Sequence, residues 1–184
     1  MSLFTEHSIE SAPEKSKAML EAAEKDMGFV PNLYKFMAES PASLEAYFKV
    51  TEILEKSSLS AKQQQIVLLA ISRENSCEFC VAAHSMIGTM MAKVDKSVID
   101  AIRDGQSTGD DTTDALITFS VKLIQQRGWV SDSDKKSFFN AGFTEENALD
   151  VVLAASLKTL SNYTNHITGT KTNDEMKEFA WTKS

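Results

Sequence analysis

Apolar residues recur at three- and four-residue intervals along most of this 184-residue chain, which is the spacing of one face of an α-helix. Glycines, prolines and capping residues divide the pattern into separate segments. The first helix is expected to open at Ala12-Pro13-Glu14 and to end at Gly28, with an apolar stripe of Met19, Leu20, Ala23 and Met27. Neither strand-like alternation nor an internal repeat occurs, so the pattern predicts an all-α fold, a compact helical bundle.

Two segments are apolar nearly all round and are expected at the centre of the bundle. The first, Ile66 to Ile71, belongs to a helix that Ser60 and Gln63 should open as a capping box. The second, Val151 to Leu160, lies in a last long helix that should begin at Thr144. The other helices are expected at residues 33–38, from Ser40-Pro41 onward, from Cys77 (capped by Ser76) to about Met91, from Asp95 to Gly105, from Thr112 or Thr113 to Gly128, and from Ser131 to about Gly142, with an exposed loop at residues 105–111.

The composition fits one globular domain over residues 1–184. Hydrophobic residues make up 42% and charged residues 24%, and the formal net charge is -7. A negatively charged protein is poorly suited to bind nucleic acid or an anionic membrane, so neither is expected as a partner. The longest apolar run, residues 66–71, is too short to cross a membrane. The N-terminal stretch MSLFTEHSIESAPEK lacks the basic start of a secretory signal, so a cytoplasmic location is expected.

The two cysteines are three positions apart, at the predicted start of a helix. Cys77, Cys80 and His84 fall within about 60° of one another on one helical face. If Ser76 caps this helix, unpaired N–H groups and the positive end of the helix dipole favour a thiolate, which is the nucleophilic form. The second thiol can then close a disulfide, and His84 can carry protons near neutral pH. This arrangement predicts thiol redox chemistry.

Two other uses of the same residues stay open. Free cysteines also pack as small buried hydrophobes. Alternatively, Cys77, Cys80 and His84 supply three zinc ligands and His166 a fourth, in a structural or binding homo-oligomer without enzymatic activity. The redox hypothesis requires neither a metal nor another cofactor.

Residues 59–84, LSAKQQQIVLLAISRENSCEFCVAAH, closely resemble the alkylhydroperoxidase D-like branch of the carboxymuconolactone decarboxylase family. GFVPNLYKFMAESPASLEAY at residues 28–47 and NYTNH at residues 162–166 resemble segments of its peroxidase-related members. The resemblance covers roughly residues 15 to 170. It implies an all-helical fold, assembly into trimers, hexamers or similar homo-oligomers, and reduction of hydroperoxides by an external thiol donor such as a lipoyl protein.

By motif position, the resemblance implies that Cys80 attacks the peroxide and that Cys77, as the more exposed partner, resolves the product. It places His84 in the proton relay. The family relay also contains a glutamate twelve residues before the first cysteine, where this chain has Gln65. Because an amide cannot accept a proton, the resemblance predicts a slow peroxidase unless Glu74 or His166 supplies the base, and Gln65→Glu should raise its rate. A general disulfide oxidoreductase with weak peroxidase activity is the alternative.

Overall fold

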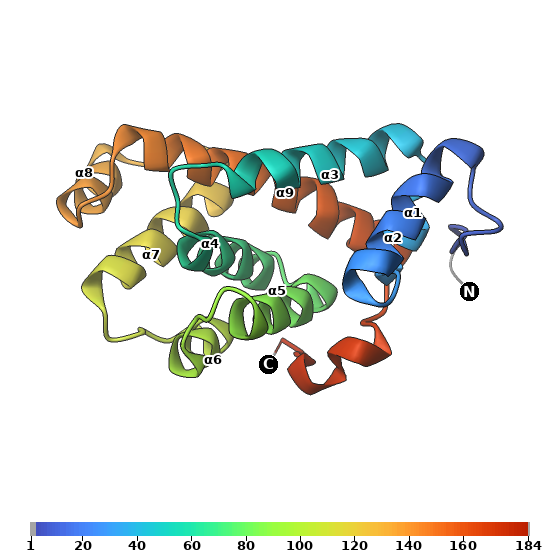
Figure 1. Cartoon of the computed structure of the whole chain (residues 1–184). Coiled ribbons are helices and arrows are strands. Elements are labelled where there is room, and N and C mark those ends of the chain that lie inside the picture. Colours follow the sequence, from blue (N-terminus) through green and yellow to red (C-terminus); the bar gives the residue numbers. More distant parts are fainter. Residues whose placement is uncertain (1–2, 184) are drawn as a thin grey trace.

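Residues 3–183 of the computed structural model are described here, and they form α-helices and one short 3-10 helix without strands (Figure 1). In chain order the segments are α1 (Glu14–Met27), α2 (Asn32–Met37), α3 (Pro41–Glu55), α4 (Ala61–Glu74), α5 (Glu78–Met90), α6 (Lys96–Asp104), α7 (Asp111–Gln125), α8 (Asp132–Asn140), α9 (Glu145–Thr168) and η1 (Asp174–Phe179). The predicted all-α class is therefore confirmed.

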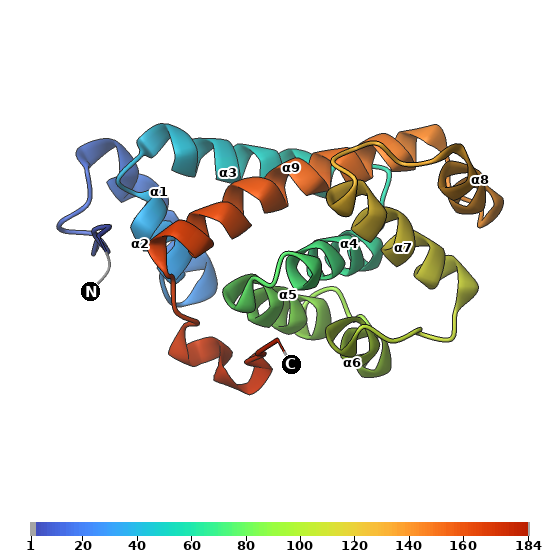
Figure 2. The same cartoon turned by 180° about the vertical axis from the view of Figure 1, so that it is seen from behind.

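Helix α4 lies at the centre of the bundle and packs against α5, α6, α7 and α9. All six residues from Ile66 to Ile71 are buried, as their sequence predicts, because removing so much apolar surface from water drives the helix inward. Helix α9 is the longest element of the described chain and runs past α2, α3, α4 and α7 (Figures 1 and 2). It is not buried all round as expected, since Val152 is exposed on its outer face.

Side-chain caps begin five of the α-helices, close to where the sequence predicts them. Ser60 and Gln63 form the expected capping box, and Thr144 caps α9 in the same way. Helix α7 starts slightly earlier than expected, because the carboxylate of Asp110 accepts a hydrogen bond from the Thr113 N–H at 2.8 Å.

The junction between α4 and α5 corrects the expected cap. Ser76 adopts a left-handed φ of 57° and so does not cap α5; Cys77 is the N-cap residue instead. The Ser76 N–H donates to the Arg73 carbonyl and the Cys77 N–H to the Ser72 carbonyl, both at 2.9 Å, which is a Schellman motif that ends α4. This junction places Cys77 at the N-terminus of α5 and Cys80 within the first turn of that helix.

The C-terminal strap, residues 174–183, is an element that the sequence pattern did not predict. Its 3-10 helix packs against α5 (Figure 2). The guanidinium of Arg103 in α6 donates hydrogen bonds of 2.8 Å to two carbonyl groups of the strap. The ammonium of Lys183 donates to the hydroxyl of Ser76 at 2.8 Å, so the strap ends beside the α4–α5 junction. Within residues 3–183, no helix combines the length and the apolar character needed to cross a membrane.

Candidate active site

The three residues singled out by sequence, Cys77, Cys80 and His84, lie together on the inward face of the α5 region. They are 1%, 2% and 7% exposed, respectively. Both thiols are free. The expectation that Cys77 is the more exposed thiol is wrong for the single chain, because the side chains of α9 close over both sulfur atoms.

Asn165 of α9 joins the two thiols. Its Nδ2 donates to Cys80 Sγ at 3.2 Å and to Cys77 Sγ at 3.5 Å. The Oδ1 of Asn165 has no hydrogen-bond partner within residues 3–183. The Nδ2 of Asn162 likewise has no partner at ordinary hydrogen-bond distance in that range, although it lies near enough to Cys80 to stabilise its charge. The site therefore holds one unused buried acceptor and one unused buried donor beside the sulfurs.

His84 is held from both sides of its ring. Nδ1 lies 3.0 Å from Gln65 Oε1, and Nε2 lies 2.8 Å from Lys158 Nζ. An ammonium only donates, so Nε2 accepts from Lys158 and Nδ1 carries the hydrogen that is donated to Gln65. Burial, followed by the charge of Lys158, holds the pKa of His84 well below its usual range. The imidazole is therefore neutral at physiological pH.

Lys158 is a residue of this cluster that the sequence analysis missed. Its residue exposure is only 1%, which is rare for a lysine. The available signal was its position, since Lys158, Asn162 and Asn165 are spaced i, i+4 and i+7 on one face of α9. A lysine inside an otherwise buried helical face is a candidate for charge chemistry, because an unpaired buried charge is costly.

The two thiols have opposite electrostatic surroundings. Burial raises the pKa of Cys80, but the hydrogen bond from Cys77, the charge and N–H groups of Lys158 and the amide of Asn162 together lower it to about 5. The pKa of Cys77 is raised far above its usual range, first by its hydrogen bond to Cys80 and then by burial. At neutral pH the site thus holds a Cys80 thiolate next to a Cys77 thiol.

Two tyrosines complete the surroundings of the thiols. Tyr34 of α2 and Tyr47 of α3 have ring centroids 5.5 Å apart, and each lies near enough to Cys80 to influence its charge. Burial raises the pKa of Tyr34 to about 12 and that of Tyr47 still further. Both hydroxyl groups are therefore neutral and can act as hydrogen-bond donors in a site closed to water.

Neither substitute base proposed from the sequence reaches the thiols. The carboxylate of Glu74 accepts a hydrogen bond from Gln125 at 3.0 Å. His166 is exposed, and its ring stacks on that of Tyr163 at 6.4 Å between centroids. Successive residues of a helix differ by about 100° in direction, so the inward position of Asn165 turns His166 toward the outside.

The fourth residue of the zinc alternative, His166, does not join the other three. His84 is engaged by Gln65 and Lys158, and His166 lies on the outer face of α9. Among residues 3–183, no three His, Cys, Asp or Glu side chains are grouped as a potential metal site.

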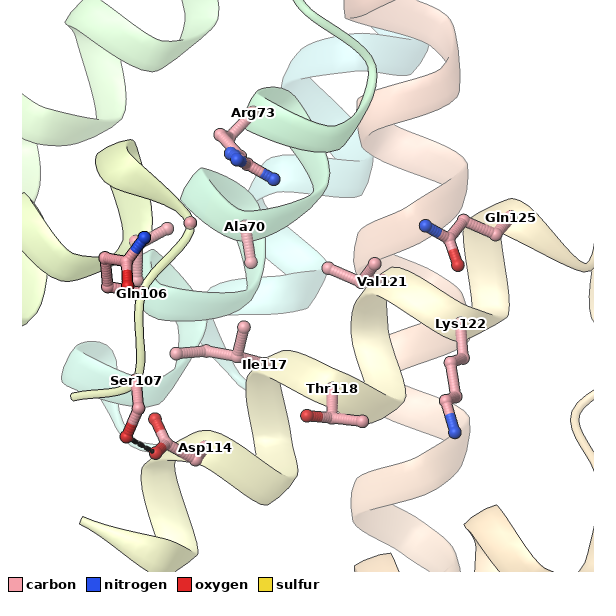
Figure 3. Close-up of a pocket in the computed structure, with 12 residues that line it drawn as sticks. Ala70, Arg73, Gln106, Ser107, Asp114, Ile117, Thr118, Val121, Lys122 and Gln125 are labelled. Atoms are coloured by element: carbon pink, nitrogen blue, oxygen red, sulfur yellow. Dashed lines mark hydrogen bonds between the residues drawn. The ribbon is translucent and has the colours of Figure 1, made fainter. Parts of the chain in front are cut away.

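A hollow of about 410 Å³ lies elsewhere, between α4, α6 and α7 (Figure 3). Ala70, Ile117 and Val121 form its apolar floor, and Arg73 and Gln125 lie at its edge. Neither cysteine lines it. The thiol site is therefore a packed polar cluster and is separate from this hollow.

Comparison with known proteins finds a family match in the segment that carries these thiols. Residues 41–112 match the model of the carboxymuconolactone decarboxylase family. The matched residues include α4 and the CxxC segment of α5, so the family resemblance seen in the sequence is confirmed. No curated protein sequence matches the chain.

Solved structures extend the similarity to nearly the whole chain. The alkylhydroperoxidase AhpD core protein of Ralstonia eutropha JMP134, a peroxidase-related protein, superposes with a TM-score of 0.83 at 24% identity, covering 95% of this chain and 94% of the other. A peroxidase-related protein of Silicibacter sp. TM1040 gives 0.80 at 18% identity, with 95% and 92% coverage. The debrominase Bmp8, solved with 2,3,4-tribromopyrrole, gives 0.81 at 15% identity, with 97% and 96% coverage. These similarities establish a shared fold.

Proposed function

We propose that this protein is a thiol-dependent peroxidase that reduces hydroperoxides through a dithiol–disulfide cycle of Cys80 and Cys77. The observation that carries the proposal is the pair of sulfurs joined by one amide, with Asn165 Nδ2 at 3.2 Å from Cys80 and 3.5 Å from Cys77. One thiol is poised as the nucleophile and its neighbour is kept protonated. A resolving thiol needs this proximity, and the difference in ionisation makes Cys80 the sulfur that attacks first.

The cycle balances in three steps. The Cys80 thiolate attacks one peroxide oxygen, so an S–O bond forms, the O–O bond breaks, and the departing alkoxide takes a proton to become an alcohol. The Cys77 thiol then attacks the sulfenic acid of Cys80, which forms the disulfide and releases water. An external dithiol reduces the disulfide and is itself oxidised. We expect the donor to be a thiol protein, such as a lipoyl protein, and no bound cofactor to take part.

The two unused polar atoms of α9 fit the hydroperoxide group. The Nδ2 of Asn162 can donate to a peroxide oxygen, and the Oδ1 of Asn165 can accept from the peroxide O–H. A buried donor and acceptor without partners are unfavourable, so a ligand that satisfies both gains affinity. Under this proposal the protein works as a cytoplasmic homo-oligomer, a trimer or hexamer.

The test measures the oxidation state of the two thiols after addition of peroxide. We expect one equivalent of hydrogen peroxide to convert two free thiols into one intramolecular disulfide, seen by mass spectrometry as the loss of two hydrogens. The Cys77→Ser variant should stop at a sulfenic acid that dimedone traps, and Cys80→Ser should not react. Thiols that stay free in folded protein under excess peroxide would falsify the proposal.

The same samples distinguish the proposed peroxidase from a general disulfide oxidoreductase. A general disulfide oxidoreductase would accept electrons from a reduced dithiol and pass them to a disulfide substrate, but would not consume peroxide. Peroxide consumption is therefore measured with dithiothreitol, dihydrolipoamide and thioredoxin as donors, beside the reduction of insulin disulfides. Insulin reduction without peroxide consumption would favour the alternative.

A further inference from the structure

Lys158 carries a full charge into the interior of the bundle. Its residue exposure is 1%, and its ammonium lies 2.8 Å from Nε2 of His84. Within residues 3–183, no carboxylate forms an ion pair with Lys158. A neutral imidazole acceptor does not balance a charge, and a buried charge without a counter-ion strongly destabilises a fold. The ammonium therefore needs an anion from the side chains that face it.

The side chains around Lys158 and the thiols leave one candidate for this anion. Helix α4 contributes the neutral Gln65, α5 contributes His84 and the two thiols, and α9 contributes two asparagine amides. Tyr34 of α2 and Tyr47 of α3 lie near the thiols, and burial keeps both hydroxyl groups protonated. The Cys77 thiol also keeps its proton. Cys80 is the group left to carry the negative charge, and Lys158 acts on it both as a charge and through its N–H groups.

We propose that Lys158 is a catalytic residue of this site, the counter-ion of the Cys80 thiolate and the acid that protonates the departing oxygen. Its place in catalysis rests on the proposed peroxidase function, whereas the ion pair stands without it. His84 holds the ammonium in place by accepting one of its N–H groups, and Gln65 fixes the ring in the tautomer that does so. In this assignment His84 is a positioning residue and Lys158 supplies the charge and the proton.

Over one cycle Lys158 gives up one proton and takes one back. When the Cys80 thiolate attacks the peroxide, the alkoxide that departs takes one proton from the ammonium, and the cation and the thiolate charge disappear together. Formation of the disulfide from the Cys77 thiol and the sulfenic acid releases water without a net change in protons. Reduction by an external dithiol regenerates one thiol and one thiolate and frees one proton, which the Lys158 amine takes back.

Lys158→Met tests the ion pair without any peroxide. Methionine keeps the length of the side chain and removes the charge, and Cys80 can then take up a proton instead of remaining a buried charge without a partner. The midpoint of thiolate formation is followed by absorbance near 240 nm and by the rate of iodoacetamide alkylation against pH. We expect the midpoint to rise from near 5 by about two units or more, with alkylation at pH 6 slowed at least about tenfold. Lys122→Met, at a partly exposed lysine of α7 that pairs with Asp134 and has no part in the charge of either thiol, is the matched control and should leave the midpoint unchanged.

A double-mutant cycle covers the case in which the single variant folds poorly. Cys80→Ser leaves the ammonium without its anion and should lower the thermal midpoint of unfolding, and adding Lys158→Met should recover part of that loss. Additive effects of the two substitutions, or an unshifted thiolate midpoint in Lys158→Met, would overturn the ion pair. If Lys158→Met shifts the midpoint while the parent protein consumes no peroxide, the ion pair stands and the peroxidase proposal fails. If Lys158→Met reacts with peroxide as fast as the parent at a pH where both are fully thiolate, the acid role is wrong.

Discussion

Nδ1 of His84 donates a hydrogen bond to the side-chain oxygen of Gln65 at 3.0 Å. This contact decides which ring nitrogen carries the hydrogen, and it leaves Nε2 free to accept from an ammonium. The amide at position 65 therefore has a clear structural role although it cannot take up a proton. The resemblance to peroxidases that carry a glutamate at this position predicted only a loss, because the sequence did not show the compensating cation of α9.

The Gln65→Glu variant should make the Cys80 thiolate harder to form. A carboxylate would stabilise a protonated His84 and compete with Cys80 for the ammonium, so we expect the pKa of Cys80 to rise by about one unit. The alkylation rate against pH measures this shift. Gln63→Glu, in the capping box at the start of the same helix, is the control. A higher plateau with an unchanged midpoint would instead support the faster, glutamate-assisted enzyme expected from sequence.

The ionisation of Cys80 should also appear in stability. Its pKa in the folded protein, about 5, is lower than that of an ordinary thiol, so the folded state favours the thiolate. That contribution is fully present above the pKa of the unfolded thiol and is lost as the pH falls through the folded value. Urea unfolding at pH 9 and pH 4.5 should therefore show a larger difference for the parent than for Cys80→Ser. Equal pH dependence in both proteins would contradict a thiolate in the folded state.

Asn165→Asp should slow the reaction of Cys80 while its immediate neighbour tolerates change. The carboxylate would replace a hydrogen-bond donor with a negative charge at a position 3.2 Å from the sulfur. We expect the pKa of Cys80 to rise and alkylation at pH 7 to fall at least about tenfold. His166→Ala should behave as the parent does, since that ring is on the outer face of α9. A comparable loss in His166→Ala would return His166 to the relay.

Loosening the C-terminal strap should expose the thiol site to large reagents. Arg103→Ala removes the two hydrogen bonds to the strap carbonyls and a third, of 3.0 Å, to the hydroxyl of Ser85 in α5. We expect a maleimide carrying a bulky substituent to label the thiols several times faster, while iodoacetamide changes little. Both rates are read by mass spectrometry, with Arg127→Ala as a control on the exposed turn after α7. Equal acceleration of the small and the large reagent would point to general unfolding.

Local patterns predicted much of this molecule because they act over one or two helical turns. The capping box at Ser60 and the apolar run from Ile66 to Ile71 specify α4 without reference to the rest of the chain. The i, i+3, i+7 spacing of Cys77, Cys80 and His84 similarly places them on one face. The strap was missed because its stabilising contacts, such as that of Arg103, join segments far apart in sequence.

The candidate site shows the same division between local and distant information. Both cysteines and His84 come from one helical segment, so their spacing alone predicted that they lie close together. Lys158 and Asn165 come from a helix about 80 residues later, and only the packing of α9 brings them to the sulfurs. The sign of the charge beside the thiols, which controls their chemistry, therefore depended on tertiary structure.

The near-complete burial of both sulfurs has a kinetic consequence. A protein-sized reductant cannot touch the disulfide in the closed chain, so each encounter must follow a fluctuation that uncovers it. Such a pre-equilibrium makes turnover level off as the reductant concentration rises, at a ceiling equal to the opening frequency. Small oxidants escape that ceiling. Under the proposed cycle, peroxide would therefore form the disulfide faster than the reductant removes it. The protein would accumulate in the disulfide form during a burst of oxidant and return to the dithiol at a rate set by its own opening.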